Sequence, residues 1–317
     1  LDTAGHLPEV VRNNTVGGRL VAAPWFVSAG LLYYRRDLLE AGGRPVPETW
    51  RDLAETAAAV MAAERARAGN DRAWGYVFQG RSYEGLTVNA LEWLAAHGAG
   101  RIVEADGRVS VHTPRAAEVL SRARSWIGTI TPLGVLNYAE EEARGVFQSG
   151  NAAFMRNWPY AWPLLNAGDS PVRGRVGIAP LPRGEGEGGS HAAGLGGEGL
   201  AVSRHTPRAE QAVGLVRHLT GREEQRRRAI AGAFPPTLTG LYDDPEVIAA
   251  NPFFRELAEV LRGAVARPSG VTGVRYNRVS AEFAATVHDV LSGRAAPEEA
   301  LARSEARLLR IGREGRW

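Results

Sequence analysis

Short apolar strand patterns alternate with amphipathic helix patterns along most of this chain, and this alternation restricts the fold more than any other feature. Strands are predicted in 18–26, at the start of 28–43, in 74–80, directly before Trp158, in 176–182 and in 199–203. Helices are predicted after a Thr49–Asp52 capping pair, over 85–100, over 113–127 and from the acidic residues at 140, and after Pro207 the chain is mostly helical. The pattern predicts an α/β fold, and a chain of 317 residues favours two lobes.

The composition is typical of a globular protein and argues against a membrane span and against a nucleic-acid partner. Hydrophobic residues make up 44% and charged residues 23% of the chain, which is enough apolar material for a large core. No apolar run approaches the roughly 18 residues that a membrane span needs. All 38 basic residues are arginine, they exceed the 35 acids by only three, and they form no basic stripe, so no nucleic-acid partner is expected.

The sequence offers no recognisable cofactor or metal site. The chain has no cysteine, and its seven histidines show no metal-ligand spacing, so no metal is expected. The segment 183–199 matches G-x-G-x-x-G twice, but neither match lies between a strand and a helix, where a dinucleotide needs it. No cofactor is therefore predicted, and Gly184–Gly189 is expected to be a flexible surface loop.

Aromatic side chains beside turns are the most suggestive chemical feature. They are Trp25, Phe26, Tyr83, Trp158, Tyr160, Trp162 and Tyr276. A ring with polar neighbours suits a ligand that has an apolar face and a hydroxylated rim, as a sugar has. The default interpretation of each ring taken alone is a place in the core, and Trp50, Trp93 and Trp126 are assigned there because they lie within helical patterns. Trp162 is also expected to pack in the core.

Carboxylates leave a second interpretation open. The run Glu140–Glu142 fits within one helical turn and is interpreted as a solvated face. The two acids of a glycosidase can come from distant positions, and the sequence does not point to a particular pair.

Four stretches, in order, resemble the sugar-binding solute-binding proteins (family 1) of bacterial ABC importers, and within them the maltose/trehalose-type binders. They are GRLVAAPWFVSAGLLYYRRDLLEAGGRPVPETWRDL (18–53), EEARGVFQSGNAAFMRNWP (141–159), GGEGLAVSRHTPRAEQAVGLVRHLTGREEQ (196–225) and the Arg-Pro…Tyr…Ser piece at 267–280. The resemblance implies a periplasmic-binding-protein-like fold of type II, with two α/β lobes that are joined by hinge strands and close on a ligand.

The resemblance also implies how the chain divides. Residues 31–180 and 245–317 would form the C-terminal lobe, and 1–25 and 195–240 the remainder of the N-terminal lobe, with hinges near 26–30, 190–195 and 240–245. Because such proteins have more residues before the first crossover, the chain is expected to lack the N-terminal part of its first lobe. No signal sequence is present in this chain, and the expected location is periplasmic or anchored at the cell surface as a lipoprotein.

Position by position, the resemblance implies a set of carbohydrate-binding residues. They are Trp25, Phe26, Ser28, Tyr83, Glu84, Asn157, Trp158, Tyr160, Gly196, Gly197, Glu198, Arg275 and Tyr276. Two positions depart from the usual pattern, because Ser28 stands where an acid is common and Glu198 where an aromatic is common. The identity of the sugar is therefore left open.

The expected function is capture of a carbohydrate, such as a maltose- or trehalose-type sugar, and its delivery to the transmembrane permease of an ABC transporter. The protein is expected to be a monomer and not an enzyme. The alternatives are an α/β carbohydrate-active enzyme, such as a glycosidase, and a truncated homologue that no longer binds.

Overall fold

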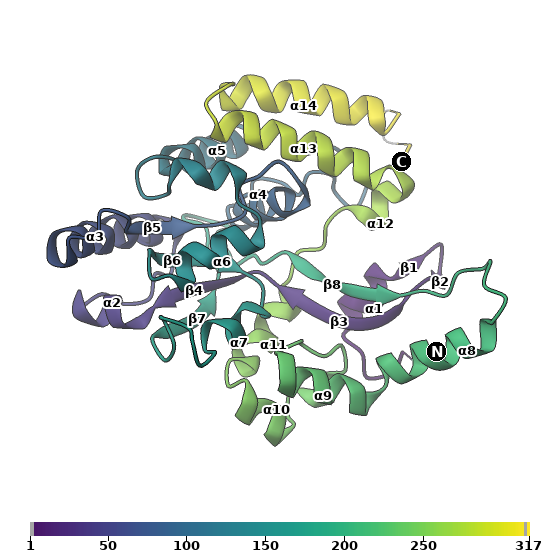
Figure 1. Cartoon of the computed structure of the whole chain (residues 1–317). Coiled ribbons are helices and arrows are strands. Elements are labelled where there is room, and N and C mark those ends of the chain that lie inside the picture. Colours follow the sequence, from purple (N-terminus) through teal and green to yellow (C-terminus); the bar gives the residue numbers. More distant parts are fainter. Residues whose placement is uncertain (1–2, 314–315) are drawn as a thin grey trace.

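A four-stranded mixed sheet forms the centre of the larger part of the molecule (Figure 1). The computed structural model describes residues 3–313 and 316–317. The strand order is β5 (Trp74–Val77), β6 (Ala152–Asn157), β4 (Leu31–Arg35) and β7 (Val176–Pro180). β5 is parallel to β6, while β4 is antiparallel to both of its neighbours. All six residues of β6 are buried, as expected for a strand covered on both faces.

A two-stranded antiparallel ribbon extends from this sheet. It consists of β3 (Ala23–Ala29) and β8 (Leu195–Leu200). Gly30 alone separates β3 from β4, so the chain runs from the ribbon directly into the sheet. A Cβ at Gly30 would lie 2.2 Å from Glu92 Oε1 and 2.6 Å from Arg156 Nη2, so only glycine fits this crossing.

Four strand predictions were wrong in their bounds. The strands expected over 74–80 and 176–182 start as predicted, but β5 ends at Val77 and β7 at Pro180. The segment 18–26 divides into β2 (Arg19–Leu20), which pairs with β1 (Thr15–Val16), and the start of β3. The strand expected at 199–203 is β8, which begins earlier and ends at Leu200. Leu200 pairs with Ala23, the first residue of β3, so residues 201–203 have no partner strand in the ribbon.

Long helices cover the sheet. Those on the side of the C-terminus in Figure 1 are α4 (Glu84–Ala96), α5 (Pro114–Trp126), α13 (Tyr276–Leu291) and α14 (Pro297–Ile311), and α13 packs against the other three. α2 (Arg36–Ala41), α3 (Trp50–Ala68) and α6 (Glu140–Gln148) complete this part. The predicted capping pair is confirmed, since Thr49 Oγ1 accepts from the Asp52 amide and Asp52 Oδ2 from the Thr49 amide.

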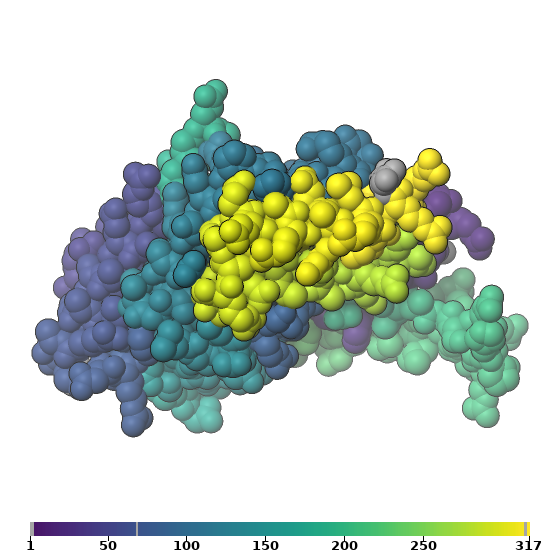
Figure 2. Space-filling model, turned by 90° about the horizontal axis from the view of Figure 1, so that it is seen from above, coloured from purple at the N-terminus to yellow at the C-terminus, as the bar shows by residue number. Residues whose placement is uncertain are grey.

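The remaining helices are short or lie around the ribbon. They are α1 (Pro8–Asn13), α7 (Ala161–Leu165), α8 (Ala209–Thr220), α9 (Arg222–Gly232), α10 (Pro245–Ala250), α11 (Phe254–Arg262) and α12 (Ser269–Thr272), with the 3-10 turns η1 (Leu133–Asn137), η2 (Thr239–Leu241) and η3 (Gly273–Arg275). Figures 1 and 2 show the region of α8 projecting at one end of the molecule. Its Val213 and Leu215 side chains are exposed.

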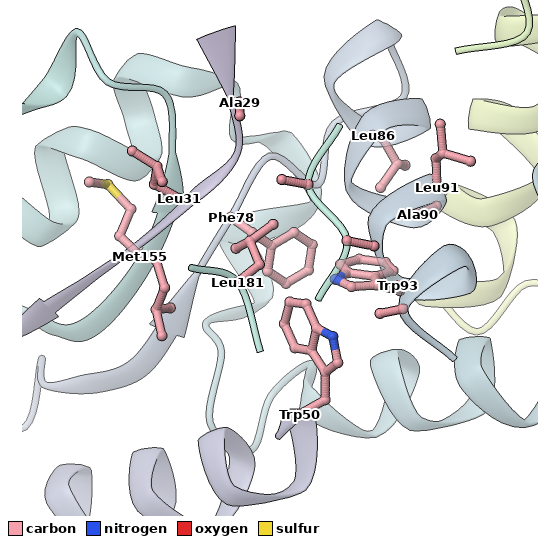
Figure 3. Packing of buried hydrophobic residues seen from close by; sticks show 14 of the residues in the cluster. Ala29, Leu31, Trp50, Phe78, Leu86, Ala90, Leu91, Trp93, Met155 and Leu181 are labelled. Carbon is pink, nitrogen blue, oxygen red and sulfur yellow. The ribbon is translucent and has the colours of Figure 1, made fainter. Parts of the chain in front are cut away.

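A cluster of aromatic rings fills the core between the sheet and the helices (Figure 3). The Trp50 and Trp126 ring centroids are 5.8 Å apart, and those of Phe78 and Trp93 are 5.2 Å apart. The assignment of the three tryptophans to the core is thus confirmed. Trp162 packs on Phe253 at 5.4 Å and is half-buried against the same core, as expected.

The boundaries of the two lobes stay a prediction. Buried side chains from the sheet, the ribbon and α9–α11 belong to one continuous hydrophobic cluster, and α11 contacts both β3 and β7. Within the described ranges, no helix has both the length and the apolar character that a membrane crossing requires.

Candidate functional site: a cleft beside the ribbon

A cleft of about 550 Å³ lies where the ribbon meets the larger part of the molecule. Its walls come from β3 and β8, the start of α4, the first residue of α6, the turn after β6 and the segment after α9. The lining residues are Phe26, Ser28, Tyr83, Glu84, Gly85, Val88, Glu140, Trp158, Tyr160, Gly196, Gly197, Glu198, Ala233, Phe234, Pro235 and Arg267. This volume lies within the range typical of small-molecule sites.

Trp158 is placed by the end of β6. Asn157 Oδ1 accepts from the Trp158 amide at 2.8 Å, and Tyr33 Oη donates to the Trp158 carbonyl at 2.8 Å. Pro159 follows directly and turns the chain away from the strand. The indole therefore projects at the cleft as a half-buried ring.

Glu140 joins two of the aromatic side chains in the cleft. Its Oε2 accepts from Tyr83 Oη at 2.6 Å, and its Oε1 from Trp158 Nε1 at 3.4 Å. Burial, followed by the hydrogen bond to Glu140, raises the pKa of Tyr83 well above its ordinary value. Tyr83 therefore remains a neutral donor at physiological pH.

Glu84, the first residue of α4, is held by three donors. Arg267 Nη1 lies 2.7 Å and Tyr276 Oη 2.5 Å from its Oε1, and Ser280 Oγ donates to its Oε2. Burial raises the pKa of Glu84, but these hydrogen bonds together outweigh burial and hold the pKa below its ordinary value. The carboxyl group is therefore ionised at neutral pH.

The glycine pair of β8 brings the ribbon close to Trp158. A Cβ at Gly196 would lie 2.9 Å from Trp158 Cζ3. Gly197 has a φ of +117°, and a Cβ there would lie 2.4 Å from the Phe26 carbonyl oxygen. Both positions need glycine, because any other residue would collide with the indole or with β3.

Nine of the thirteen residues predicted as carbohydrate contacts line this cleft. They are Phe26, Ser28, Tyr83, Glu84, Trp158, Tyr160, Gly196, Gly197 and Glu198. Tyr160 Oη donates to Glu141 at 2.6 Å. Glu198 lies opposite Phe26 in the ribbon, and its side chain forms no ion pair or hydrogen bond with the part of the chain that the structure describes. Ligand binding by these nine residues stays a prediction.

The structure places the other four predicted residues outside the lining. Trp25 occupies the bulge of β3, where its ring packs under the Arg228 guanidinium at 4.8 Å. Asn157 is buried behind Trp158. Tyr276 supports Glu84 from behind, and Arg275 faces away, donating to the Arg316 carbonyl oxygen. Direct ligand contact by these four residues stays a prediction that the cleft lining does not support.

Sequence reasoning missed several residues of the cleft. Glu140, interpreted there as part of a solvated face, lines the cleft instead, because α6 begins beside Trp158. Phe234 and Pro235 also line the cleft, and the same criterion of an aromatic beside a proline would have found them. Arg267 was noted within a motif but not as a site residue. Gly85, Val88 and Ala233 carry no signal in the sequence.

The described residues contain no group of three His, Cys, Asp or Glu side chains that could hold a metal ion. Aromatic rings and carboxylates are prominent among the side chains that line the cleft. Rings can stack on an apolar ligand face, and carboxylates can accept hydrogen bonds from hydroxyl groups.

A cleft with this lining, beside the ribbon, is typical of a small-molecule-binding protein, and comparison with known proteins places the chain more closely. The chain belongs to the family of bacterial extracellular solute-binding proteins, whose sequence profile matches residues 1–255. A probable ABC transporter-binding protein of Deinococcus radiodurans is 47% identical over 315 residues, which are 99% of this chain and 74% of that relative.

Two further comparisons involve sugar-binding proteins. The maltose-bound structure of T. maritima MalE3 is 40% identical, with a TM-score of 0.91 over 98% of this chain and 77% of that one. A maltodextrin-binding protein of Bacillus subtilis is 24% identical over 82% of this chain but only 60% of its own length. This chain thus spans about three quarters or less of each of these relatives.

These findings confirm the family recognised from the sequence motifs and the type II binding-protein fold. They also confirm the expected class of function, that of a solute-binding protein of an ABC sugar transporter. The homologues are binding proteins and not enzymes, and the family implies a location outside the cytoplasm.

Proposed function

We propose that the chain binds an uncharged carbohydrate in the cleft, with one sugar ring on Trp158, and presents it to the permease of an ABC importer. The observation that supports this most is the position of the Trp158 indole, which lines the cleft while Glu140 holds its Nε1. A planar ring beside carboxylates matches the apolar face and the hydroxyl rim of a pyranose.

The charges of the side chains that line the cleft favour ligands without a negative charge. Three carboxylates, those of Glu84, Glu140 and Glu198, face the cleft, and Arg267 is the one cation among the lining residues that the structure describes. That arginine is already paired with Glu84. A phosphate or carboxylate on the ligand would meet a surplus of negative charge, so the cleft favours uncharged sugars.

Maltose is the first ligand to test, because the solved structure of the T. maritima relative has maltose bound. The protein acts as a monomer outside the cytoplasmic membrane, in the periplasm or anchored at the cell surface through a lipid. Closure of the two lobes around the sugar presents it to the transmembrane subunits. No nucleic acid takes part.

Isothermal titration of the protein in its full natural length tests the proposal. Maltose, trehalose and sucrose are the trial ligands, and glycerol 3-phosphate is the anionic control. We expect heat of binding with at least one sugar and none with the phosphate. A folded protein that gives neither heat nor a thermal shift with any carbohydrate would contradict the proposal and favour a homologue that has lost binding.

A glycosidase is the second candidate, and the three cleft carboxylates are the observation that favours it. A general acid must hold its proton near neutral pH, whereas the pKa of Glu84 is lowered. Both oxygens of Glu140 are occupied by Tyr83 and Trp158. We expect maltose to remain intact after prolonged incubation with the protein, and release of glucose would establish the enzyme instead.

A further inference from the structure

Beneath Trp158 lies a buried ion pair that the proposed binding chemistry does not use. The Arg156 and Glu92 side chains are 1% and 0% exposed. Arg156 Nη2 donates to Glu92 Oε1 at 2.5 Å and Arg156 Nε to Glu92 Oε2 at 2.9 Å, which is a bidentate pair. Arg156 Nη1 also donates to Gln79 at 3.2 Å.

The Arg156 guanidinium packs against one face of the Trp158 indole. Its central carbon lies 4.0 Å from the centroid of the Trp158 ring, which is within the range of a cation–π contact. Arg156 is not among the residues that line the cleft. One face of the indole is therefore occupied by Arg156 while the ring itself borders the cleft.

The Glu92 carboxylate connects Arg156 to the segment before β8 of the ribbon. Glu92 Oε1 accepts from the Gly194 amide at 2.9 Å, directly before β8. Gly30 leaves space for the pair at the crossing between β3 and β4. Arg156 is thus fixed by Glu92 of α4, which Gly194 holds in turn, and by Gln79, two residues after β5. Its plane therefore has little freedom to rotate.

We infer that Arg156 is a positioning residue for carbohydrate binding: its guanidinium, oriented by Glu92, holds the Trp158 indole in the conformation that receives the sugar ring. This inference rests on the proposed function for its ligand, but the orientation of the ring can be measured without one. A pre-positioned ring loses less side-chain entropy on binding, which strengthens affinity.

The variant that tests this is Arg156→Met together with Glu92→Gln. The methionine removes the cation, and the glutamine avoids an unpaired buried carboxylate while keeping an acceptor for Gly194. We expect the Kd for maltose to weaken about tenfold. The same pair of substitutions added to Trp158→Ala is expected to change the Kd less than about twofold, because the guanidinium acts through the indole. An equal loss in both backgrounds would show a general structural role and overturn the inference.

Arg156→Lys is the second variant, for the case in which the double substitution does not fold. Lysine keeps the charge opposite Glu92 but lacks the planar group, so we expect an intermediate loss of affinity. Arg65 supplies the matched control, because it lies 4.9 Å from the Trp74 ring and is not in the cleft lining. Arg65→Met removes a comparable contact and is expected to leave maltose binding unchanged.

A readout that needs no ligand separates this inference from the proposed function. The near-ultraviolet circular dichroism of Trp158 is obtained as the difference between the protein and its Trp158→Phe variant. We expect this difference to shrink when Arg156 is replaced, whether or not maltose binds. An unchanged difference would overturn the positioning role, whereas absence of binding of every carbohydrate tested by the unmodified protein would contradict only the proposed function.

Discussion

The indole of Trp158 is restrained by three different kinds of contact. Arg156 covers one face, Glu140 accepts from the ring nitrogen, and Gly196 allows the ribbon backbone to approach the ring edge. Each contact comes from a different segment of the chain. A side chain held in this way is already ordered before a ligand arrives.

Replacement of Trp158 by alanine is expected to weaken carbohydrate binding about tenfold to a hundredfold. The loss reflects the stacking and the apolar burial of one sugar ring, which together are worth about 1–3 kcal/mol. Isothermal titration with the sugar that binds best measures the change.

The control for this prediction is Trp158→Phe, which keeps a ring but loses the hydrogen bond to Glu140. We expect it to retain part of the affinity that Trp158→Ala loses. If Trp158→Ala binds the sugar as tightly as the unmodified protein, the sugar ring does not stack on Trp158.

At the scale of elements, the ribbon depends on glycine at a place where a side chain would collide with the opposite strand. Gly197 combines a positive φ with a Cβ position 2.4 Å from the Phe26 carbonyl oxygen. We expect Gly197→Ala to lower the free energy of unfolding by about 1–3 kcal/mol. Urea denaturation followed by circular dichroism measures this loss.

Gly214 in α8 is the matched control, because nothing lies within 4 Å of its Cβ position and it occupies a helix interior. Gly214→Ala is expected to be neutral or to stabilise by up to about 1 kcal/mol. Equal effects of the two substitutions would contradict the steric account of the ribbon.

Most elements could be predicted from the sequence because their signals are local. The Thr49 cap, the glycines that follow α2 and the strand before Trp158 all depend on neighbouring residues. The end of β8 could not be predicted in this way, since it is set by where β3 begins across the ribbon. Pairing between distant segments leaves no mark in a short window of sequence.

The residues of the cleft also divide into those with a local signal in the sequence and those whose role depends on distant segments. Trp158 and the glycine pair stand in motifs that could be recognised along the chain. The roles of Glu140 and Arg267 arise from side chains more than a dozen residues away, Trp158 and Glu84 respectively. The charge of an isolated acid or arginine does not reveal whether it faces solvent or a cleft.

At the scale of the whole molecule, the glycine-rich segment expected to be a flexible loop is attached to the helical part by Glu185. This carboxylate accepts from the Arg51 amide at 2.7 Å, lies 3.0 Å from His97 Nε2 and pairs with Arg122. Burial raises its pKa, but the Arg122 and Arg51 hydrogen bonds outweigh burial and lower the pKa to about 2.

This lowered pKa predicts a loss of stability in acid. A carboxyl group with an ordinary pKa of 4.5 that falls to about 2 in the folded protein stabilises the fold above pH 4.5. That contribution disappears as the pH falls from 4.5 to 2, because protonation then releases the partners. We expect Glu185→Gln to lower the free energy of unfolding at pH 7 by up to about 3 kcal/mol, with the difference from the unmodified protein shrinking toward pH 2.

Denaturation with urea at pH 7, 4.5 and 2.5 measures this dependence. Glu187→Gln in the same loop is the control, because only the backbone carbonyl of Glu187 takes part in a hydrogen bond that the structure records. A difference between Glu185→Gln and the unmodified protein that stays constant across these pH values would contradict the assignment.

Gly30, at the crossing between ribbon and sheet, restricts which substitutions homologues of this chain can carry. Its missing side chain makes room for the Arg156–Glu92 pair. Positions 30, 92 and 156 should therefore change together. Homologues that keep both charged residues are expected to keep glycine, and those that have replaced the pair with smaller side chains are free to accept alanine or serine at position 30.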